Sequence, residues 1–336
     1  MKVSINAISY YLPEKVLSNK DLVNEFGTWS EDKIYKKTGI IERHVVTEEI
    51  VSDIAVKAAL KLFEENDIQK EEIDFLLLCT ECPDYFLPST ACVVQGRLGL
   101  RKDIGAYDMN LGCSGFIYGL ATAKGLICAG LAKNVLFITA DTLSKTIHPL
   151  DKSTRTLLGD AAAATLISKS DVDGVLDFVL GTDGGGMCTI IIPAGAWAAP
   201  SSEETRIEET NRWGNVRTKE NLYMDGPEVM NFIIDVVPKM FEDVLIKNNM
   251  KFDEIDNVVL HQASYIILDK LRDKLNIPEE KFFINIENKG NTASCSIPLA
   301  LRDMQIQGRL KKGDKILTMG FGVGLSYAGT IINWAI

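Results

Sequence analysis

The chain has 336 residues, of which 46% are hydrophobic and 24% are charged. These proportions are those of globular proteins and exclude a disordered, collagen-like or coiled-coil chain, while the length suits two domains or one large α/β unit. Acidic residues outnumber basic ones by 46 to 36, and this net charge of −10 disfavours nucleic acid and anionic membrane surfaces as partners.

The first elements of the chain predict an α/β fold, because short β-branched or aromatic runs alternate with longer amphipathic helical patterns. Residues 53–79 read as a helix, a polar turn and a buried strand that ends at Cys79. Further along, Asn-Leu-Gly precedes Cys113, which opens a helix crowded with glycine and alanine, and a strand follows at 135–140. The segment 181–221 is rich in Gly, Ser and Glu and is predicted to be an inserted surface loop that starts with a flexible turn at 181–186.

The second part of the chain repeats the first. An offset of 182 residues aligns 53–78 with 235–260 without a gap, and it places Asn66 on Asn248. An offset of 178 residues places Cys113 on Asn291, ahead of a further helix and a strand at 315–319. This internal repeat predicts two duplicated βαβ halves, residues 1–170 and 171–336.

Cys113 is the candidate nucleophile. A thiol at the start of a helix feels unpaired N–H groups and the positive end of the helix dipole, so we expect its pKa to lie below the usual value of about 8.5. The alternative is a small, buried, apolar cysteine.

The candidate base comes from only three histidines. His44 and His148 lie in polar stretches and are expected to be solvated, whereas His261 follows the buried strand of the second repeat. Ligands of α/β sheets bind beyond the carboxyl ends of strands, which makes His261 the candidate, with a core histidine as the alternative. Because duplicated halves face each other, Cys113, His261 and Asn291 are expected to converge.

Seven motifs carry a resemblance that covers nearly the whole chain. The sequence resembles the thiolase-fold condensing enzymes, specifically the β-ketoacyl-acyl-carrier-protein synthase III group, a fold of αβαβα layers. The motifs are KTGIIERH (37–44), LPSTAC (87–92), GCSG (112–115), GDAA (159–162), HQA (261–263), NKGNT (288–292) and GFGVG (320–324).

The resemblance implies a two-stage acyltransferase reaction in fatty acid or related lipid biosynthesis. Cys113 takes an acyl group from a primer thioester, while the backbone N–H groups of Cys113 and Val323 stabilise the oxyanion. A malonyl thioester then enters, His261 Nε2 and the Asn291 amide donate to its carbonyl during decarboxylation, and the enolate attacks the acyl-enzyme. No metal or organic cofactor is implied, only thioesters of coenzyme A or acyl carrier protein.

The sequence departs from the family pattern where family members hold coenzyme A. Lysines 33, 37 and 152 stand where a tryptophan and arginines are frequent in the family. The lysines keep a positive charge, but they lack the aromatic ring that stacks and the guanidinium that forms paired hydrogen bonds with the coenzyme A nucleotide. Ser264 replaces an asparagine and Ile266 an arginine. An acidic carrier protein would need a local basic patch for docking. The candidates for thioester or carrier binding are Lys33, Lys37, Lys152, Ser264, Lys270, Arg272 and Lys274.

Residues 85–87, Tyr-Phe-Leu, form an apolar cluster in a loop. The resemblance implies a homodimer in which Leu87 crosses the twofold interface and lines the partner's acyl tunnel. The alternative is that the cluster folds back onto its own core.

Several other interpretations are weaker. Cys79 and Cys82 form a C-x-x-C without the further ligands of a zinc site, so no metal is expected. The seven cysteines of the chain are odd in number, and with no apolar signal segment at its start they predict free thiols in the cytoplasm. No apolar run approaches the roughly 18 to 20 residues of a membrane span. A thiol hydrolase, a transferase to an alcohol or amine, and a non-catalytic paralogue stay open.

Overall fold

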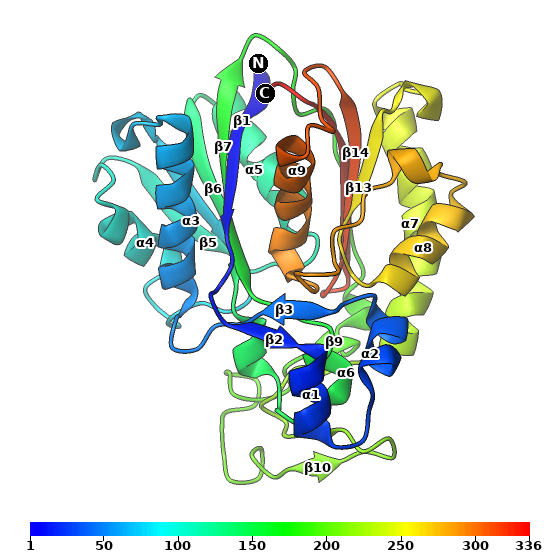
Figure 1. The fold of residues 1–336 in the computed structure, drawn as a ribbon. Coiled ribbons are helices and arrows are strands. Elements are labelled where there is room, and N and C mark those ends of the chain that lie inside the picture. Colours follow the sequence, from blue (N-terminus) through cyan, green and yellow to red (C-terminus); the bar gives the residue numbers. More distant parts are fainter.

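Two mixed β-sheets form the framework of the computed structural model, which describes residues 1–336 (Figure 1). The first sheet has the strand order β1-β7-β6-β4-β5. In it β4 is parallel to β5 and β6, whereas β7 is antiparallel to both of its neighbours. Its strands are β1 (Lys2–Tyr11), β4 (Phe75–Cys79), β5 (Gly105–Met109), β6 (Asn134–Asp141) and β7 (Ala161–Ser170).

The second sheet repeats this topology in the order β13-β14-β15-β8. β13 is parallel to β14, and β15 is antiparallel to β14 and β8. The run β4-β6-β7-β1 of the first sheet therefore has the same order and directions as β13-β14-β15-β8, which confirms the duplication. The strands are β8 (Val179–Thr182), β13 (Asn257–Leu260), β14 (Lys315–Gly322) and β15 (Ser326–Asn333).

Helices form three layers around the two sheets, which gives the expected αβαβα arrangement (Figure 1). Helices α5 and α9 lie between the sheets, where one hydrophobic core joins Phe116 and Leu301 with Phe137 of the first sheet and Ile316 of the second. α3 and α4 cover the outer face of the first sheet, and α7 and α8 that of the second. The helices are α3 (Val51–Asn66), α4 (Thr90–Leu98), α5 (Gly115–Cys128), α7 (Gly226–Lys247), α8 (Tyr265–Lys274) and α9 (Ser296–Ile306).

The strands that lead to the site are apolar on both faces because helices cover both sides of each sheet. β4 has the sequence Phe-Leu-Leu-Leu-Cys and β13 the sequence Asn-Val-Val-Leu, and every residue of β13 is buried. A 3₁₀ turn precedes each strand, at Lys70–Glu72 and Phe252–Glu254. The proposed division at residue 170 falls at the end of β7 and stays a prediction.

Short elements close one end of the layers, at the bottom of Figure 1. The predicted flexible turn at 181–186 is wrong in its first residues. Gly181 pairs with Tyr327 in the second sheet, and the Tyr327 ring fills the space where a side chain at Gly181 would lie. In the rest of the segment, β10 pairs with β11, and β9 pairs with β12, which lies just beyond residue 221. The elements at this end are β2 (Val16–Ser18), α1 (Asn19–Phe26), α2 (Glu31–Thr38), β3 (Glu42–His44), α6 (Lys152–Arg155), β9 (Ile190–Ile191), β10 (Glu209–Thr210), β11 (Val216–Arg217) and β12 (Tyr223–Met224).

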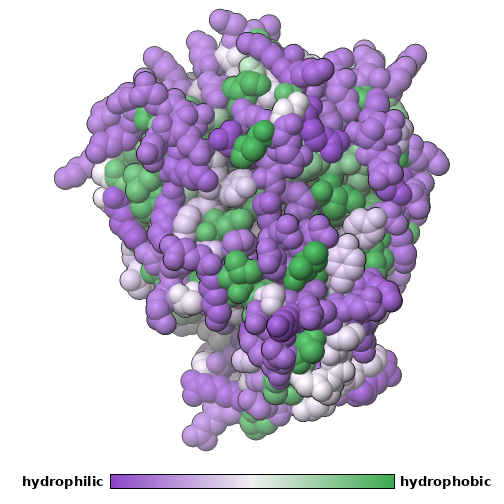
Figure 2. Space-filling view, in the orientation of Figure 1, coloured by the Kyte–Doolittle hydropathy of each residue, from purple (hydrophilic) through white to green (hydrophobic).

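The face of the molecule in Figure 2 is mainly hydrophilic, and its hydrophobic residues form small, separate groups. No helix combines the length and the apolar character that crossing a membrane would require.

Candidate active site

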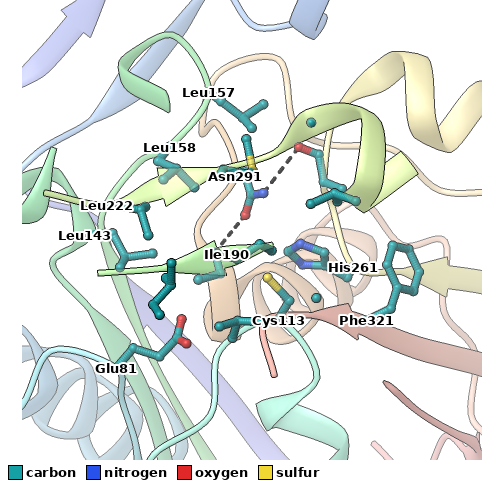
Figure 3. Close-up of a pocket in the computed structure, with 18 of the residues that line it drawn as sticks. Glu81, Cys113, Leu143, Leu157, Leu158, Ile190, Leu222, His261, Asn291 and Phe321 are labelled. Atoms are coloured by element: carbon teal, nitrogen blue, oxygen red, sulfur yellow. Dashed lines mark hydrogen bonds between the residues drawn. The ribbon is translucent and has the colours of Figure 1, made fainter. Parts of the chain in front are cut away.

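A cavity of about 340 Å³ lies between the two halves and is lined by residues from both. Most of its lining side chains are hydrophobic, but Cys113, His261 and Asn291 all face it. Figure 3 shows these three groups gathered around the same space. The structure thus brings the three candidate side chains together, although they are far apart in the sequence.

Cys113 lies in the turn between β5 and α5, two residues before the helix begins. The glycines of β14 make room for it. A methyl group at Gly320 would lie 2.6 Å from the Cys113 carbonyl oxygen, and one at Gly322 would lie 2.8 Å from its Sγ. Glycine is therefore required here for close approach of the backbone, which gives the GFGVG segment a structural reason.

The expectation of a lowered thiol pKa is wrong. Burial raises the pKa of the Cys113 thiol above its ordinary value, and the negative charges of Glu81 and Asp141 raise it further. The backbone N–H groups of Cys113 and Val323 act in the opposite direction on this sulfur but do not prevail. The helix start is visible in the sequence, whereas the apolar cavity and the carboxyl groups around the sulfur arise only in the folded chain.

His261 is held in one orientation directly after β13. Its Nδ1 shares a 2.7 Å hydrogen bond with the hydroxyl of Ser296, and its ring stands edge-to-face against Phe321. Burial lowers the pKa of His261 to about 3, with partial opposition from a backbone hydrogen bond to Ala293. The imidazole is therefore neutral at physiological pH.

Asn291 is fixed by two hydrogen bonds, drawn as dashed lines in Figure 3. Its Nδ2 donates to the Ala263 carbonyl over 3.3 Å, and its Oδ1 accepts from the Ala293 N–H over 2.9 Å. The second N–H of the amide makes no hydrogen bond within the protein, so it is free to serve a ligand in the cavity.

Sequence reasoning missed Glu81, which also lines the cavity. It follows β4, and its backbone N–H donates to Asp141 Oδ1 over 2.8 Å. Burial, followed by the charge of Asp141, raises the pKa of Glu81 to about 8. The sequence does contain a feature that points to Glu81. It is a carboxylate two residues beyond a buried parallel strand, where ligands of α/β sheets bind.

The candidate residues for thioester and carrier binding lie outside the cavity lining. Lys33 and Lys37 of α2 stack over Trp29, with Nζ 4.7 and 4.9 Å from the ring centre. Sequence reasoning missed this tryptophan, which lies in the chain just before α2. Lys152 donates to the Gly214 carbonyl of the inserted segment over 3.1 Å.

The other candidates are on α8. Ser264 is buried and caps the helix, since its hydroxyl accepts from the Ile267 N–H over 3.3 Å. Arg272 pairs with Asp269 and Asp273, and Lys274 donates to the Ile234 carbonyl. Lys270 is exposed. These cations are thus interspersed with acids.

Leu87 does not line the cavity of its own chain. Its side chain is 82% exposed, and Phe86 beside it is 75% exposed and near Trp197, with ring centres 6.0 Å apart. The cluster therefore does not fold back onto its own core.

Comparisons with known proteins identify the family. A family model described as 3-oxoacyl-[acyl-carrier-protein] synthase III matches residues 107–184, and the model of its C-terminal part matches residues 245–334. The chain is 38% identical to the β-ketoacyl-[acyl-carrier-protein] synthase III of Fusobacterium nucleatum, with 99% of each chain covered. The chain belongs to the 3-oxoacyl-[acyl-carrier-protein] synthase III family. It is an acyl-transferring condensing enzyme of this type.

Solved structures of 3-oxoacyl-(acyl-carrier-protein) synthases agree with the fold. A crystal structure of a 3-oxoacyl-(acyl-carrier-protein) synthase III superimposes with a TM-score of 0.97 at 45% identity, covering 99% of this chain and 100% of that one. A 3-oxoacyl-(acyl carrier protein) synthase from Burkholderia xenovorans gives a TM-score of 0.92 at 32% identity, covering 100% and 95%. Within the synthase III chain, the first family match contains Cys113 and the second contains His261, Asn291 and Val323.

Proposed function

We propose that this synthase III condenses an acyl thioester primer with a malonyl thioester through an acyl-Cys113 intermediate, in fatty acid or related acyl chain biosynthesis. The observation that carries the proposal is the convergence of Cys113, His261 and Asn291 in one largely apolar cavity. A thiol provides the acyl acceptor, the two other groups provide hydrogen-bond donors, and the apolar walls suit an acyl chain.

In the first stage, the Cys113 sulfur attacks the primer carbonyl. In this proposal the backbone N–H groups of Cys113 and Val323 stabilise the oxyanion, which is supported by their nearness to the sulfur on which both act. In the second stage, neutral His261 through Nε2 and the free N–H of Asn291 donate to the malonyl carbonyl. Their donation stabilises the enolate that forms as CO₂ leaves, and the enolate carbon attacks the acyl-enzyme.

The proposal needs no metal or organic cofactor. Its substrates are thioesters of coenzyme A or of an acyl carrier protein, and we propose the carrier protein as a partner that docks near Lys33, Lys37 and Lys270. Seven free cysteines favour a cytoplasmic location.

We also propose a homodimer. The exposed cluster of Tyr85, Phe86 and Leu87 is apolar, and a twofold contact would bury the clusters of both subunits at once. Leu87 would then reach the partner's acyl cavity.

Incubation with a panel of acyl thioesters, followed by mass analysis of the Cys113 peptide, tests the first stage. Release of labelled CO₂ from malonyl thioester and detection of the β-ketoacyl product test the second. Acylation without condensation, together with transfer to an added alcohol or amine, would refute the proposal in favour of a different acceptor. Hydrolysis alone would identify a thiol hydrolase.

A further inference from the structure

The cavity lining includes one carboxyl side chain that the proposed function leaves unused. Glu81 lines the cavity beside Cys113, and no residue forms a hydrogen bond or an ion pair with its carboxyl group. The cavity lining contains neither lysine nor arginine. An ionised carboxyl group without a partner in a largely apolar cavity is unfavourable for folding, so the presence of Glu81 there calls for a chemical explanation.

The position of Glu81 relates it to the cysteine rather than to the histidine. Its carboxyl group packs over Gly112, the residue before Cys113, where a methyl group on Gly112 would lie 2.1 Å from Oε2. In Figure 3, Glu81 and His261 lie on opposite sides of Cys113. The backbone hydrogen bond to Asp141 fixes the base of the Glu81 side chain, and the flexible remainder faces the cavity that the thiol also faces.

The resting state of Cys113 creates a need for such a group. Because the pKa of the thiol is raised, Cys113 rests as a thiol and must lose a proton to attack a primer. A general base works best when its own pKa lies near the working pH, which Glu81 with a pKa of about 8 satisfies and His261 with a pKa of about 3 does not.

We propose that Glu81 is a fourth catalytic residue, which takes the proton from the Cys113 thiol during acyl transfer and returns a proton to this sulfur after condensation. The proposal rests on the proposed function, in which Cys113 carries the acyl group. The proposal requires that Glu81 exchange a proton with the thiol, either after side-chain rotation within the cavity that both line or through one water molecule.

The atoms balance in both stages. In the first, the S–H bond of Cys113 breaks, its electron pair forms the S–C bond to the acyl group, and the proton passes to Glu81 and then to the departing thiolate of the primer carrier. In the second, CO₂ leaves, the enolate forms the C–C bond, the acyl S–C bond breaks, and the Cys113 sulfur takes a proton from Glu81. Glu81, left as a carboxylate after the first stage, first takes this proton from solvent, and it is a carboxylate again when the next primer arrives.

Other titratable groups surround Glu81 and must be considered in any pH profile. Burial raises the pKa of the thiols of Cys79 and Cys82, so they stay protonated. Asp141, whose pKa burial raises to about 7, is the neighbour that titrates in the same range. The charge of Glu81 acts on Cys79, Cys82 and Cys113, the charge of Asp141 acts on Glu81, and His261 shares the cavity.

The test uses Glu81→Gln, which keeps the shape but removes the proton acceptor. Single-turnover acylation by butyryl-coenzyme A is followed by intact mass from pH 6 to 9. The wild type should accelerate with pH and level off near pH 8. Glu81→Gln should be roughly 10² to 10⁴-fold slower at pH 8 and should not level off. Glu81→Asp should restore part of the rate, and Glu209→Gln, an exposed matched control, should behave as wild type.

Two further measurements separate catalysis from structure. Glu81→Gln should retain decarboxylation of malonyl thioester within about threefold, which shows that the site is folded. Alkylation of Cys113 by iodoacetamide should begin at a lower pH in Glu81→Gln, because a negative neighbour is removed. The proposal would be overturned if Glu81→Gln were acylated at the wild-type rate. It would also be overturned if Glu81→Gln were acylated more slowly but the pH profiles of its acylation and alkylation matched those of the wild type. Absence of any acyl adduct on wild-type Cys113 would instead count against the proposed function.

Discussion

Gly322 of β14 lies directly against Cys113, so that a methyl group at Gly322 would be only 2.8 Å from both Cβ and Sγ of the cysteine. The strand of one half therefore sets the position of the thiol carried by the other half. No other residue type fits without displacing the sulfur.

Gly322→Ala should consequently reduce the rate of Cys113 acylation by roughly 10 to 10²-fold, because small displacements of reacting groups cost rate of that order. The melting temperature should also fall, because rotation of the Cys113 side chain relieves the contact with Sγ but not the contact with Cβ, so the backbone has to shift. Gly125→Ala on α5 is the matched control. No atom lies near Gly125, so this variant should keep full activity. An unchanged acylation rate in Gly322→Ala would show that the sulfur position tolerates the contact.

Cys113 should be the only essential thiol. Cys113→Ala should remove the acyl-enzyme and all condensation, whereas Cys82→Ala should leave both nearly intact because the Cys82 side chain does not line the cavity. Mass analysis of peptides after incubation with acyl thioester checks the assignment. A stable adduct on another cysteine, with none on Cys113, would contradict it.

His261→Ala and Asn291→Ala should impair the malonyl stage more than the acyl-transfer stage. Removal of one oxyanion donor costs on the order of 10² to 10³ in rate, so both variants should still acylate Cys113 but release CO₂ from malonyl thioester poorly. Separate single-turnover assays of the two stages measure this. The assignment of roles is wrong if His261→Ala loses acylation and keeps decarboxylation.

Features that depend on neighbouring residues in the sequence or on its internal repeat were predicted, whereas other features that depend on residues far apart in the sequence were not. The strands, the duplication and the convergence of Cys113, His261 and Asn291 follow from local patterns and from symmetry, which a sequence contains. The pKa of Cys113 depends on burial and on Glu81 and Asp141, which only the assembled site brings near the sulfur. Trp29 went unnoticed for a similar reason, because its relation to Lys33 and Lys37 depends on how the chain enters α2.

Stability should depend on pH through Glu81. Its pKa is raised from 4.5 to about 8, so the folded state binds this proton more tightly than the unfolded state does. The contribution to stability is complete below pH 4.5 and is lost as the pH rises through about 8. Glu81→Gln does not ionise, so its melting temperature relative to wild type should rise between pH 5 and pH 8.5. A constant difference across this range in thermal unfolding would contradict the raised pKa.

Leu87 offers the sharpest test of the proposed dimer. The residue is 82% exposed in the single chain, so a change in its size can affect acyl chain selection only if a partner subunit receives it. One methylene group of a substrate in an apolar pocket changes its binding free energy by roughly 1 to 3 kcal/mol, so a change in chain-length preference is measurable. Leu87→Trp should therefore shift the optimum of Cys113 acylation toward shorter primers, without unfolding the protein, while Leu131→Trp at another exposed leucine should not. Acylation rates over a series of acyl thioesters, together with sedimentation, decide the matter. An unchanged primer profile in Leu87→Trp, or a monomer at working concentration, would rule out an acyl tunnel completed by the partner.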